Sequence, residues 1–384
     1  MPHNRLAPSR YFTGMSILTL SLGAGARAPG RPVHSSSGAP RRCPVSILGV
    51  PFDAVTADEA LVRIADMVDA GEPRYVVTPN VDFLVQSRLD PELHRILCEA
   101  DLVLCDGQPL VWASRWLGNP LPERVAGADL APRLMAQAAR RGHRVFLLGA
   151  SPEANEAATR RLRELHPSLR LVGHFSPPYA PLARMDHGAI IRRVRAAQPD
   201  LLIVGFGCPK QEKWIARFHR ELGVPVCLGM GGTIDFLAGR LSRAPRWMRR
   251  AGLEWSYRLL LEPRRLFRRY ATDLHSFGAA LLAQWWHLRR GAARATPGAF
   301  DRTTVERLGG LWREIEAAEG DCRVDLSGVG FIDATGAAVL TVWHRLLRRR
   351  GHRLVLAGPR EQVERLLRPL GLDDVLVGER EAAR

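Results

Sequence analysis

Lysine is nearly absent from this sequence, which has 55 basic residues and a net charge of +16. Only Lys210 and Lys213 are lysines, so almost all of the positive charge comes from arginine. Arginine binds phosphate oxygens through a planar fork of donors that lysine does not have. A strongly basic chain is typical of proteins that bind nucleic acid, an anionic membrane or a phosphorylated substrate, and charge alone favours none of these.

Cysteine pairs of the kind that hold zinc are missing as well. The six cysteines include no C-x-x-C pair, and they lie at positions 43, 98, 105, 208, 227 and 322. This spacing argues against a zinc site and against a disulfide framework, and it favours a reducing cytoplasm. No run reaches the roughly 18–20 apolar residues of a membrane span.

Several motifs of nucleotide-binding and nucleic-acid-binding proteins are also lacking. The turns at Gly205-Phe206-Gly207 and Gly229–Gly232 have no third glycine in dinucleotide-fingerprint spacing, which excludes a nicotinamide enzyme. Metal-dependent sugar transferases commonly hold Mg²⁺ or Mn²⁺ on the diphosphate of the sugar donor through a D-x-D pair of carboxylates. No D-x-D stands before residue 300, so arginines would have to neutralise such a diphosphate. We therefore expect no metal and no cofactor. No helix-turn-helix, zinc finger or RNP motif is evident, and we expect no nucleic acid partner.

Residues 1–44 do not read as part of a folded domain. Met15–Ala28 contains a short apolar stretch that resembles a signal h-region, but the Gly/Pro/Ser/Arg-rich run after it is typical of disorder. We favour a disordered tail, or a start codon assigned too far upstream, over true export.

From residue 45 to 240 short apolar runs alternate with longer amphipathic stretches, which predicts an α/β fold with a mostly parallel, Rossmann-like sheet. The expected strands are Val45–Val50, Arg74–Val77, Leu102–Cys105, Arg144–Leu148, Leu169–Val172, Leu201–Val204 and Pro225–Leu228. Ligands of such sheets bind at the carboxyl ends of the strands. The residues that directly follow each strand are therefore the candidate functional residues.

Polar side chains follow two of these strands. Asp106 comes after Leu102–Cys105 and is a candidate general base, because Gly107 keeps the backbone clear of its carboxylate. Equally, Asp106 could cap the next helix. Thr78 and Asn80 follow Arg74–Val77 and could bind sugar hydroxyls, although ordinary turn chemistry is the favoured interpretation of these two residues taken alone.

Arginine dominates residues 241–290, which we expect to form a basic helical appendage. Between Arg240 and Arg294 there are 13 arginines, three acidic residues and several interleaved aromatic residues. This composition favours contact with a membrane surface, where arginine meets lipid phosphate and tryptophan lies at the interface. A packed helical hairpin with a solvated arginine face is the alternative. Residues 291–299 then read as a linker.

Seven motifs occur in one order between Val45 and Tyr270, and together they resemble the WecG/TagA/CpsF glycosyltransferase family. They are TPNVDF, LCDGQPLVW, PLPERVAGADL, GFGCPKQEKWI, GMGGTIDFLAG, RAPRWM and GLEWSYRLLLEPRRLFRRY. The resemblance implies inverting, metal-independent transfer of a sugar, such as N-acetylmannosamine, from a UDP donor. The acceptor would be an undecaprenyl-diphosphate-linked sugar in cell-surface polysaccharide synthesis.

The resemblance also assigns roles to residues. The family's catalytic base falls on Asp106, and its substrate-binding residues fall on Thr78, Asn80, Arg124 and Gln211. A single carboxylate fits an inverting mechanism, which needs no second, nucleophilic carboxylate.

The family's basic appendage touches the membrane and closes over the active site, which places this chain at the cytoplasmic face as a peripheral membrane protein. The expected contacts with membrane or diphosphate are Arg243, Arg246, Arg249, Arg250 and Arg258. Gln108 and Pro109 stand where relatives often carry smaller residues. The donor could therefore be N-acetylmannosamine, its uronate or a plain hexose.

Residues 300–384 resemble a STAS domain, a small α/β fold used in protein–protein regulation. The resemblance rests on the run RVDLSGVGFIDATG from Arg323 to Gly336. Some STAS domains are phosphorylated at a helix N-terminus, which makes Thr335 a candidate phosphoacceptor. We favour helix capping by Asp333 and Thr335, with the domain docking a protein partner. No clear first strand precedes Thr303, so we expect a trimmed copy.

A second hypothesis is that the chain is a STAS-type regulatory scaffold whose first domain only senses a nucleotide sugar. A decayed enzyme of this kind would be expected to have lost some of the five site residues, whereas all five are present.

Overall fold

The computed structural model describes residues 18–21, 42–240, 244–245, 248, 254–261, 263–293, 299–301, 305, 314–315, 317–368, 372 and 376–377. The chain forms two compact units. One consists mainly of Arg42–Ala293, and the other consists mainly of residues C-terminal of Ala293 together with an N-terminal strand.

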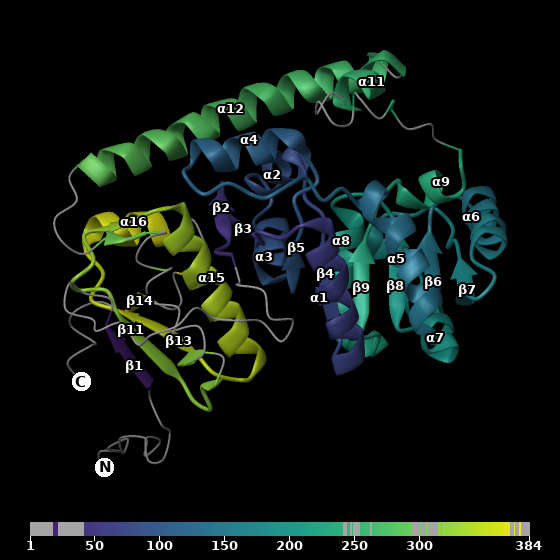
Figure 1. Cartoon of the computed structure of the whole chain (residues 1–384), viewed down its shortest axis with the longest axis horizontal. Helices are drawn as coiled ribbons and strands as arrows, with labels where there is room; N and C mark the ends of the chain where they lie inside the picture. The colour runs from purple at the N-terminus through teal and green to yellow at the C-terminus, as the bar shows by residue number, and fades with distance from the viewer. Residues whose placement is uncertain are drawn as a thin grey trace, which may run out of the picture. The chain divides into compact units, whose positions relative to one another are not determined.

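A six-stranded parallel sheet forms the centre of the first unit (Figure 1). Its strands, in spatial order, are β5 (Leu102–Val103), β4 (Arg74–Val77), β9 (Val226–Gly229), β8 (Leu201–Gly205), β6 (Arg144–Gly149) and β7 (Arg170–Phe175). All five neighbouring pairs are parallel. The predicted α/β fold with a parallel sheet is therefore confirmed.

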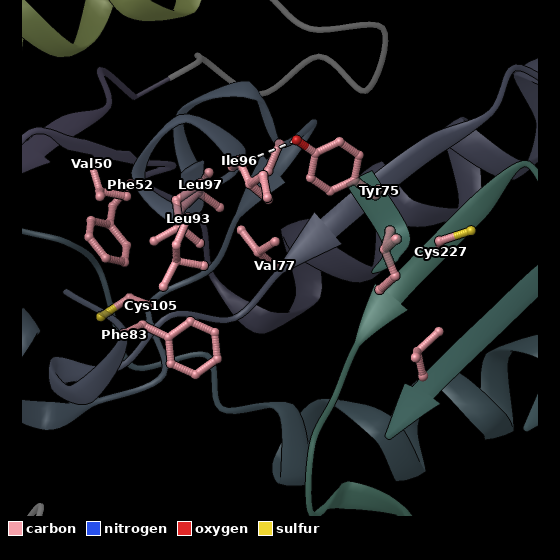
Figure 2. Packing of buried hydrophobic residues seen from close by; sticks show 14 of the residues in the cluster. Val50, Phe52, Tyr75, Val77, Phe83, Leu93, Ile96, Leu97, Cys105 and Cys227 are labelled. Carbon is pink, nitrogen blue, oxygen red and sulfur yellow. Dashed lines mark hydrogen bonds between the residues drawn. The ribbon is translucent and has the colours of Figure 1, made fainter. Parts of the chain in front are cut away.

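Buried side chains alternate between the two faces of this sheet. Val76 packs into one apolar cluster and Val77 into the other, as do Val145 and Phe146 in β6. This two-residue alternation is what a strand covered on both faces requires. Figure 2 shows one of the two clusters, where the Tyr75 hydroxyl also donates a 2.8 Å hydrogen bond to the carbonyl of Ile96.

Helices cover both faces of the sheet. On one face, residues of four helices join a single apolar cluster: α1 (Ala57–Ala70), α5 (Gly127–Arg141), α6 (Pro152–Leu165) and α9 (Thr233–Leu237). On the other face lie α2 (Val81–Ser87), α3 (Pro91–Glu99), α4 (Gln108–Trp116), α7 (His187–Ala197) and α8 (Lys210–Leu222). A short 3₁₀ turn, η1 (Leu182–Arg184), precedes α7.

Local sequence sets the ends of these helices. Thr56 and Glu59 form a reciprocal capping box at the start of α1, with hydrogen bonds of 3.2 and 2.8 Å. The same helix ends at Gly71, whose φ of 70° lies in the left-handed region that glycine adopts without strain.

The middle of the sheet is where the chain changes direction. From β4 the chain moves outward to β5 at one edge, and from β6 it moves outward to β7 at the other. Strands β9 and β8 lie between β4 and β6, in the middle of the sheet. Sheets of this type bind ligands at such a switch point, beyond the carboxyl ends of the strands.

The first predicted strand, Val45–Val50, is instead an antiparallel hairpin. It consists of β2 (Val45–Ile47) and β3 (Val50–Phe52), joined through Leu48 and Gly49 at φ values of 50° and 89°. A run of apolar residues does not reveal a turn this tight, because both arms of the hairpin are buried.

Two helices form the described part of the basic segment. They are α11 (Glu254–Leu261) and α12 (Pro263–Ala293), and the helix break expected near Pro263 is present. In Figure 1, α12 runs beside α2 and α4. We call α11 and α12 together the appendage.

The second unit contains a parallel four-stranded sheet in the order β1 (Leu18–Ser21), β11 (Cys322–Asp325), β13 (Leu354–Ala357) and β14 (Leu376–Val377). A separate parallel pair joins β10 (Ala299–Phe300) to β12 (Phe331–Ile332). The helices described in this unit are α15 (Ala334–Arg349) and α16 (Glu361–Leu367). Most of the expected helix Thr303–Glu319 lies outside the described residues.

Two expectations about this unit need correction. The structure describes a strand before Thr303, namely β10, which is only two residues long and therefore left little sequence signal. Four residues of the segment expected to be a disordered tail form β1, paired in parallel with β11. The alternation Leu-Thr-Leu-Ser has the two-residue period of a strand, and only the distant partner strand makes this short run recognisable.

Candidate active site

Thr78 and Asn80 follow β4 at the centre of the sheet. The Thr78 side chain is buried, and its hydroxyl lies 3.5 Å from the carbonyl oxygen of Gly229, at the end of the neighbouring strand β9. Asn80 is the N-cap of α2, where its Oδ1 accepts a hydrogen bond of 3.2 Å from the backbone N–H of Phe83. This oxygen of Asn80 therefore has a local structural role, as a helix cap.

Asp106 follows β5 and forms hydrogen bonds with the loop after β4 and with the start of α5. Its backbone N–H donates to the carbonyl of Pro79 at 3.0 Å, and its Oδ2 accepts from the backbone N–H of Gly127 at 3.2 Å. The N-cap of the next helix, α4, is Gly107 without a side-chain hydrogen bond, so Asp106 does not cap that helix. Its carboxylate lies instead at the N-terminus of α5, where a negative charge is favoured. The side chain is half-buried.

Arg124 lies between two carboxylates. Its Nη1 is 2.7 Å from Oε2 of Glu254 in α11, and its Nη2 is 2.6 Å from Oδ2 of Asp129 in α5. Burial by itself lowers the pKa of Arg124, but the hydrogen bond to Glu254 and the negative charge of Asp106 outweigh it, so that the pKa is raised. Arg124 is therefore a permanent positive charge close to the candidate base.

Gln211 contacts the loop that follows β8. Its side chain is 1% exposed; Oε1 accepts from the N–H of Gly207 at 3.0 Å, and Nε2 donates to Oε1 of Glu212 at 2.7 Å. Both of these contacts shape the turn after β8. Glu212 is fully buried, and burial raises its pKa to about 7.

Close approaches between glycines and side chains show that these loops form one cluster. A Cβ added to Gly127 would lie 3.4 Å from Oγ1 of Thr233 and 3.5 Å from Oγ1 of Thr78. One added to Gly107 would lie 3.8 Å from Cβ of Asn80. The loops after β4, β5 and β9 therefore meet at the N-terminus of α5.

The loop after β8 joins the same cluster through β9. A Cβ added to Gly229, at the end of β9, would lie 3.2 Å from Nε2 of Gln211. Connected loops at the carboxyl end of the sheet, and the first turn of α8, thus contain the five residues Thr78, Asn80, Asp106, Arg124 and Gln211.

Sequence reasoning did not single out Gly127, Thr233, Asp129 or Glu254. For Thr233 a signal was available, because this residue follows the glycine-rich turn after the expected strand Pro225–Leu228. For Glu254 there was none, since 130 residues separate it from its partner Arg124.

Among the described residues, the appendage forms ion pairs with this cluster at two places. Besides the pair of Glu254 with Arg124, Arg269 of α12 lies 3.4 Å from Oδ2 of Asp82, two residues after Asn80. Four of the arginines expected to contact membrane or diphosphate, namely 243, 246, 249 and 250, lie outside the described residues. Arg258 belongs to α11, but its side chain is not described.

Large apolar side chains are exposed on the appendage and on the adjacent helix α4. They are Trp112, Trp116, Trp255, Leu260, Phe267, Leu274, Leu282 and Trp286. Trp116 stacks on Trp285 of α12, with ring centroids 5.6 Å apart. No helix in the described part of the chain is both long enough and apolar enough to cross a membrane.

Asp333 caps helix α15 of the second unit. Its Oδ1 accepts hydrogen bonds from the N–H groups of Thr335 and Gly336, both at 2.8 Å. The role of Thr335 as a phosphoacceptor stays a prediction.

Among the described residues no group of three or more His, Cys, Asp or Glu side chains could hold a metal ion.

Comparison with known proteins agrees with this arrangement. Residues 45–291, more than half of the chain, match the model of the glycosyl transferase WecG/TagA/CpsF family, and residues 296–378 match that of the Mlab, STAS domain. Similar proteins include the N-acetylglucosaminyldiphosphoundecaprenol N-acetyl-beta-D-mannosaminyltransferases of Staphylococcus aureus strains MRSA252 and NCTC 8325 / PS 47. Each is 30% identical over 226 residues, which are 58% of this chain and 87% of the relative. The chain is therefore a glycosyltransferase that belongs to the WecG/TagA/CpsF family and carries a STAS-type region after the transferase unit.

Proposed function

We propose that this enzyme transfers N-acetylmannosamine from its UDP donor to an undecaprenyl-diphosphate-linked N-acetylglucosamine, with inversion and without a metal ion. The names of the two Staphylococcus aureus relatives support both the sugar transferred and the lipid-linked acceptor. The observation that carries the proposal is the placement of Asp106. Its carboxylate is held by the N–H of Gly127 near the partly buried guanidinium of Arg124.

In the proposed reaction Asp106 removes the proton from the attacking hydroxyl of the acceptor. The oxygen of that hydroxyl bonds to the anomeric carbon as the bond from this carbon to the donor diphosphate breaks, and the electron pair leaves with UDP. Because attack and departure occur on opposite faces, an α-linked donor gives a β-linked product. Arg124 stabilises the charge that grows on the diphosphate, a role that a guanidinium fork performs well.

The second part of the proposal is that the enzyme works on the cytoplasmic face of the membrane as a peripheral protein. The net charge of +16 and the exposed tryptophans of α4 and the appendage support this location. Tryptophan favours the membrane interface, and basic segments favour anionic lipid. A surface-bound enzyme would meet an acceptor whose polyprenyl chain stays in the bilayer.

The test is a transfer assay with UDP-N-acetylmannosamine and a short polyprenyl-diphosphate N-acetylglucosamine acceptor. We expect Asp106→Asn to lower kcat by about 10²- to 10⁴-fold, the usual contribution of a general base, while UDP still binds. Asp69→Asn is the matched control, because this exposed carboxylate pairs with Arg141 at 3.1 Å, away from the site loops, and should leave the rate unchanged.

Two further measurements address the finer parts of the proposal. Activity should persist in excess EDTA, and loss of activity that Mg²⁺ restores would contradict the metal-independent reaction. Parallel assays with the uronate and with plain UDP-hexoses test the donor, and faster transfer from one of these would replace N-acetylmannosamine in the proposal. Near-normal transfer by Asp106→Asn would remove Asp106 as the base.

A further inference from the structure

The two terminal nitrogens of Arg124 are each held by a different part of the chain. Asp129 belongs to α5, inside the sheet-and-helix core, whereas Glu254 belongs to α11 of the appendage. The two contacts are 2.6 and 2.7 Å long, and the side chains of Arg124 and Glu254 are 16% and 13% exposed. Short, charge-assisted hydrogen bonds of this kind are stronger than neutral ones, and they gain further from partial burial.

This arrangement restrains a side chain that otherwise has many rotamers. The long arginine side chain has several rotatable bonds, so an unrestrained guanidinium would populate several orientations. One carboxylate could hold one nitrogen and still allow the plane to turn, whereas two carboxylates on Nη1 and Nη2 fix the plane. Each contact uses one N–H group, and a guanidinium has five of them. Donors therefore remain for a third anion.

We propose that Glu254 is a positioning residue: by holding Nη1 of Arg124, it sets the orientation in which this guanidinium binds the diphosphate of the donor. The inference rests on the proposed function, because it takes a nucleotide diphosphate as the ligand of Arg124. Because Glu254 belongs to α11, both terminal nitrogens of Arg124 are held only when α11 lies in place.

Electrostatic repulsion acts in the opposite direction. Glu254 is a negative charge beside the site proposed for the diphosphate, and Asp106 and Asp129 are two more negative charges around Arg124. If repulsion dominated, Glu254 would compete with the diphosphate, and neutralising it would tighten nucleotide binding. If positioning dominates, neutralising it weakens binding and slows transfer. The two effects therefore predict changes of opposite sign.

The experiment compares four full-length proteins: wild type, Glu254→Gln, Asp129→Asn and Arg269→Gln. Glutamine keeps the shape of Glu254 and removes its charge. Arg269→Gln is the matched control, because it breaks the other described ion pair between the appendage and the site loops, that of Arg269 with Asp82 at 3.4 Å, without touching Arg124. The readouts are UDP affinity by calorimetry, and kcat and donor KM in the transfer assay.

We expect Glu254→Gln to weaken UDP binding several-fold and to lower kcat by about 10- to 100-fold, the scale of a misplaced catalytic group. Asp129→Asn should change both quantities in the same direction. Arg269→Gln should leave kcat within about twofold of the wild type, a limit well below the loss expected from misplacing Arg124. Glu254→Asp, which keeps the charge on a shorter side chain, should fall between wild type and Glu254→Gln, a partial rescue that a purely structural role would not give.

Three outcomes would overturn the inference. Tighter UDP binding by Glu254→Gln would mean that Glu254 competes with the nucleotide. Equal losses in Glu254→Gln and Arg269→Gln would mean that Glu254 only anchors the appendage. Unchanged UDP affinity and kcat in Glu254→Gln would mean that it does neither. If the wild type transfers no sugar, the proposed function fails, whereas the UDP titration still decides the role of Glu254.

Discussion

Asp106 accepts a hydrogen bond of 3.2 Å from the backbone N–H of Gly127, a residue 21 positions further along the chain. The carboxylate thus lies at the N-terminus of α5 and not at that of α4, the helix that follows it directly. Residue Ala126, the N-cap of α5, makes no side-chain capping bond, so Asp106 fills this role from another loop. A helix terminus thereby orients the candidate base.

The space around Gly127 gives the first prediction. A single methyl group there would make ordinary contacts of 3.4 and 3.5 Å with the hydroxyls of Thr233 and Thr78, so Gly127→Ala should keep most of the activity. Gly127→Val adds two further methyl groups against these hydroxyls and should displace the loop that holds Asp106. We expect transfer to fall by about 100-fold in Gly127→Val, measured as kcat/KM. Equal activity of the two variants would contradict the crowding argument.

Glu212 gives a prediction about pH. Burial raises its pKa to about 7, whereas in the unfolded chain it titrates near 4.5. Between these two values the folded protein keeps a proton that the unfolded chain releases, so the free energy of unfolding falls as the pH rises through this window. The fall amounts to about 3 kcal/mol at most.

Replacing Glu212 by Gln, which mimics the protonated carboxyl group, tests this dependence. We expect the stability of Glu212→Gln relative to the wild type to increase between pH 4.5 and 7, and the variant to be more stable than the wild type at pH 8. Urea unfolding of both proteins at several pH values measures this difference. A difference that stays constant or shrinks over this window would show that Glu212 does not titrate there.

Gln284 of α12 gives a prediction about the attachment of the appendage. Its Oε1 accepts from the N–H of Leu48 and its Nε2 donates to the carbonyl of Ser46, both at 2.9 Å, so one amide pairs with the backbone of the β2–β3 hairpin. Gln284→Leu leaves both backbone groups without this partner and should cost about 2 kcal/mol. Amide hydrogen exchange along α12 should accelerate in this variant. Gln284→Glu keeps the acceptor for Leu48 but places a carboxylate oxygen against the carbonyl of Ser46, so it should be no more stable than Gln284→Leu.

The exposed tryptophans of α4 give a prediction about membrane binding. Trp112 and Trp116 are 47% and 55% exposed, and Trp116 stacks on Trp285 of the appendage. The double variant Trp112→Ser/Trp116→Ser should bind vesicles of phosphatidylglycerol and phosphatidylcholine about tenfold more weakly or worse, because less apolar area leaves water. Tyr179→Ser is the control, since this side chain is 98% exposed but lies in the loop after β7. A matching loss in the control would show that the effect is not specific to α4.

Much of the fold follows from patterns that short segments carry. The parallel sheet could be predicted because strands covered on both faces are continuous apolar runs, separated by amphipathic helices. Strand β1 could not be predicted in this way, because Leu18–Ser21 is a strand only through its pairing with β11, some 300 residues later. The hairpin β2–β3 could not be predicted from hydropathy either. Both of its strands are buried, so apolar residues continue through the turn.

The residue types that follow each strand can be read from the sequence, and they identify the candidate side chains after β4, β5 and β8. The roles of these side chains depend on how the chain folds. The tertiary structure directs the carboxylate of Asp106 to the N-terminus of α5, buries Gln211 beneath its loop, and brings Glu254 to Arg124 across 130 residues. The physical reason is that side-chain chemistry is local, whereas hydrogen bonds and ion pairs form between whatever groups the packed sheet and helices bring within about 3 Å of one another.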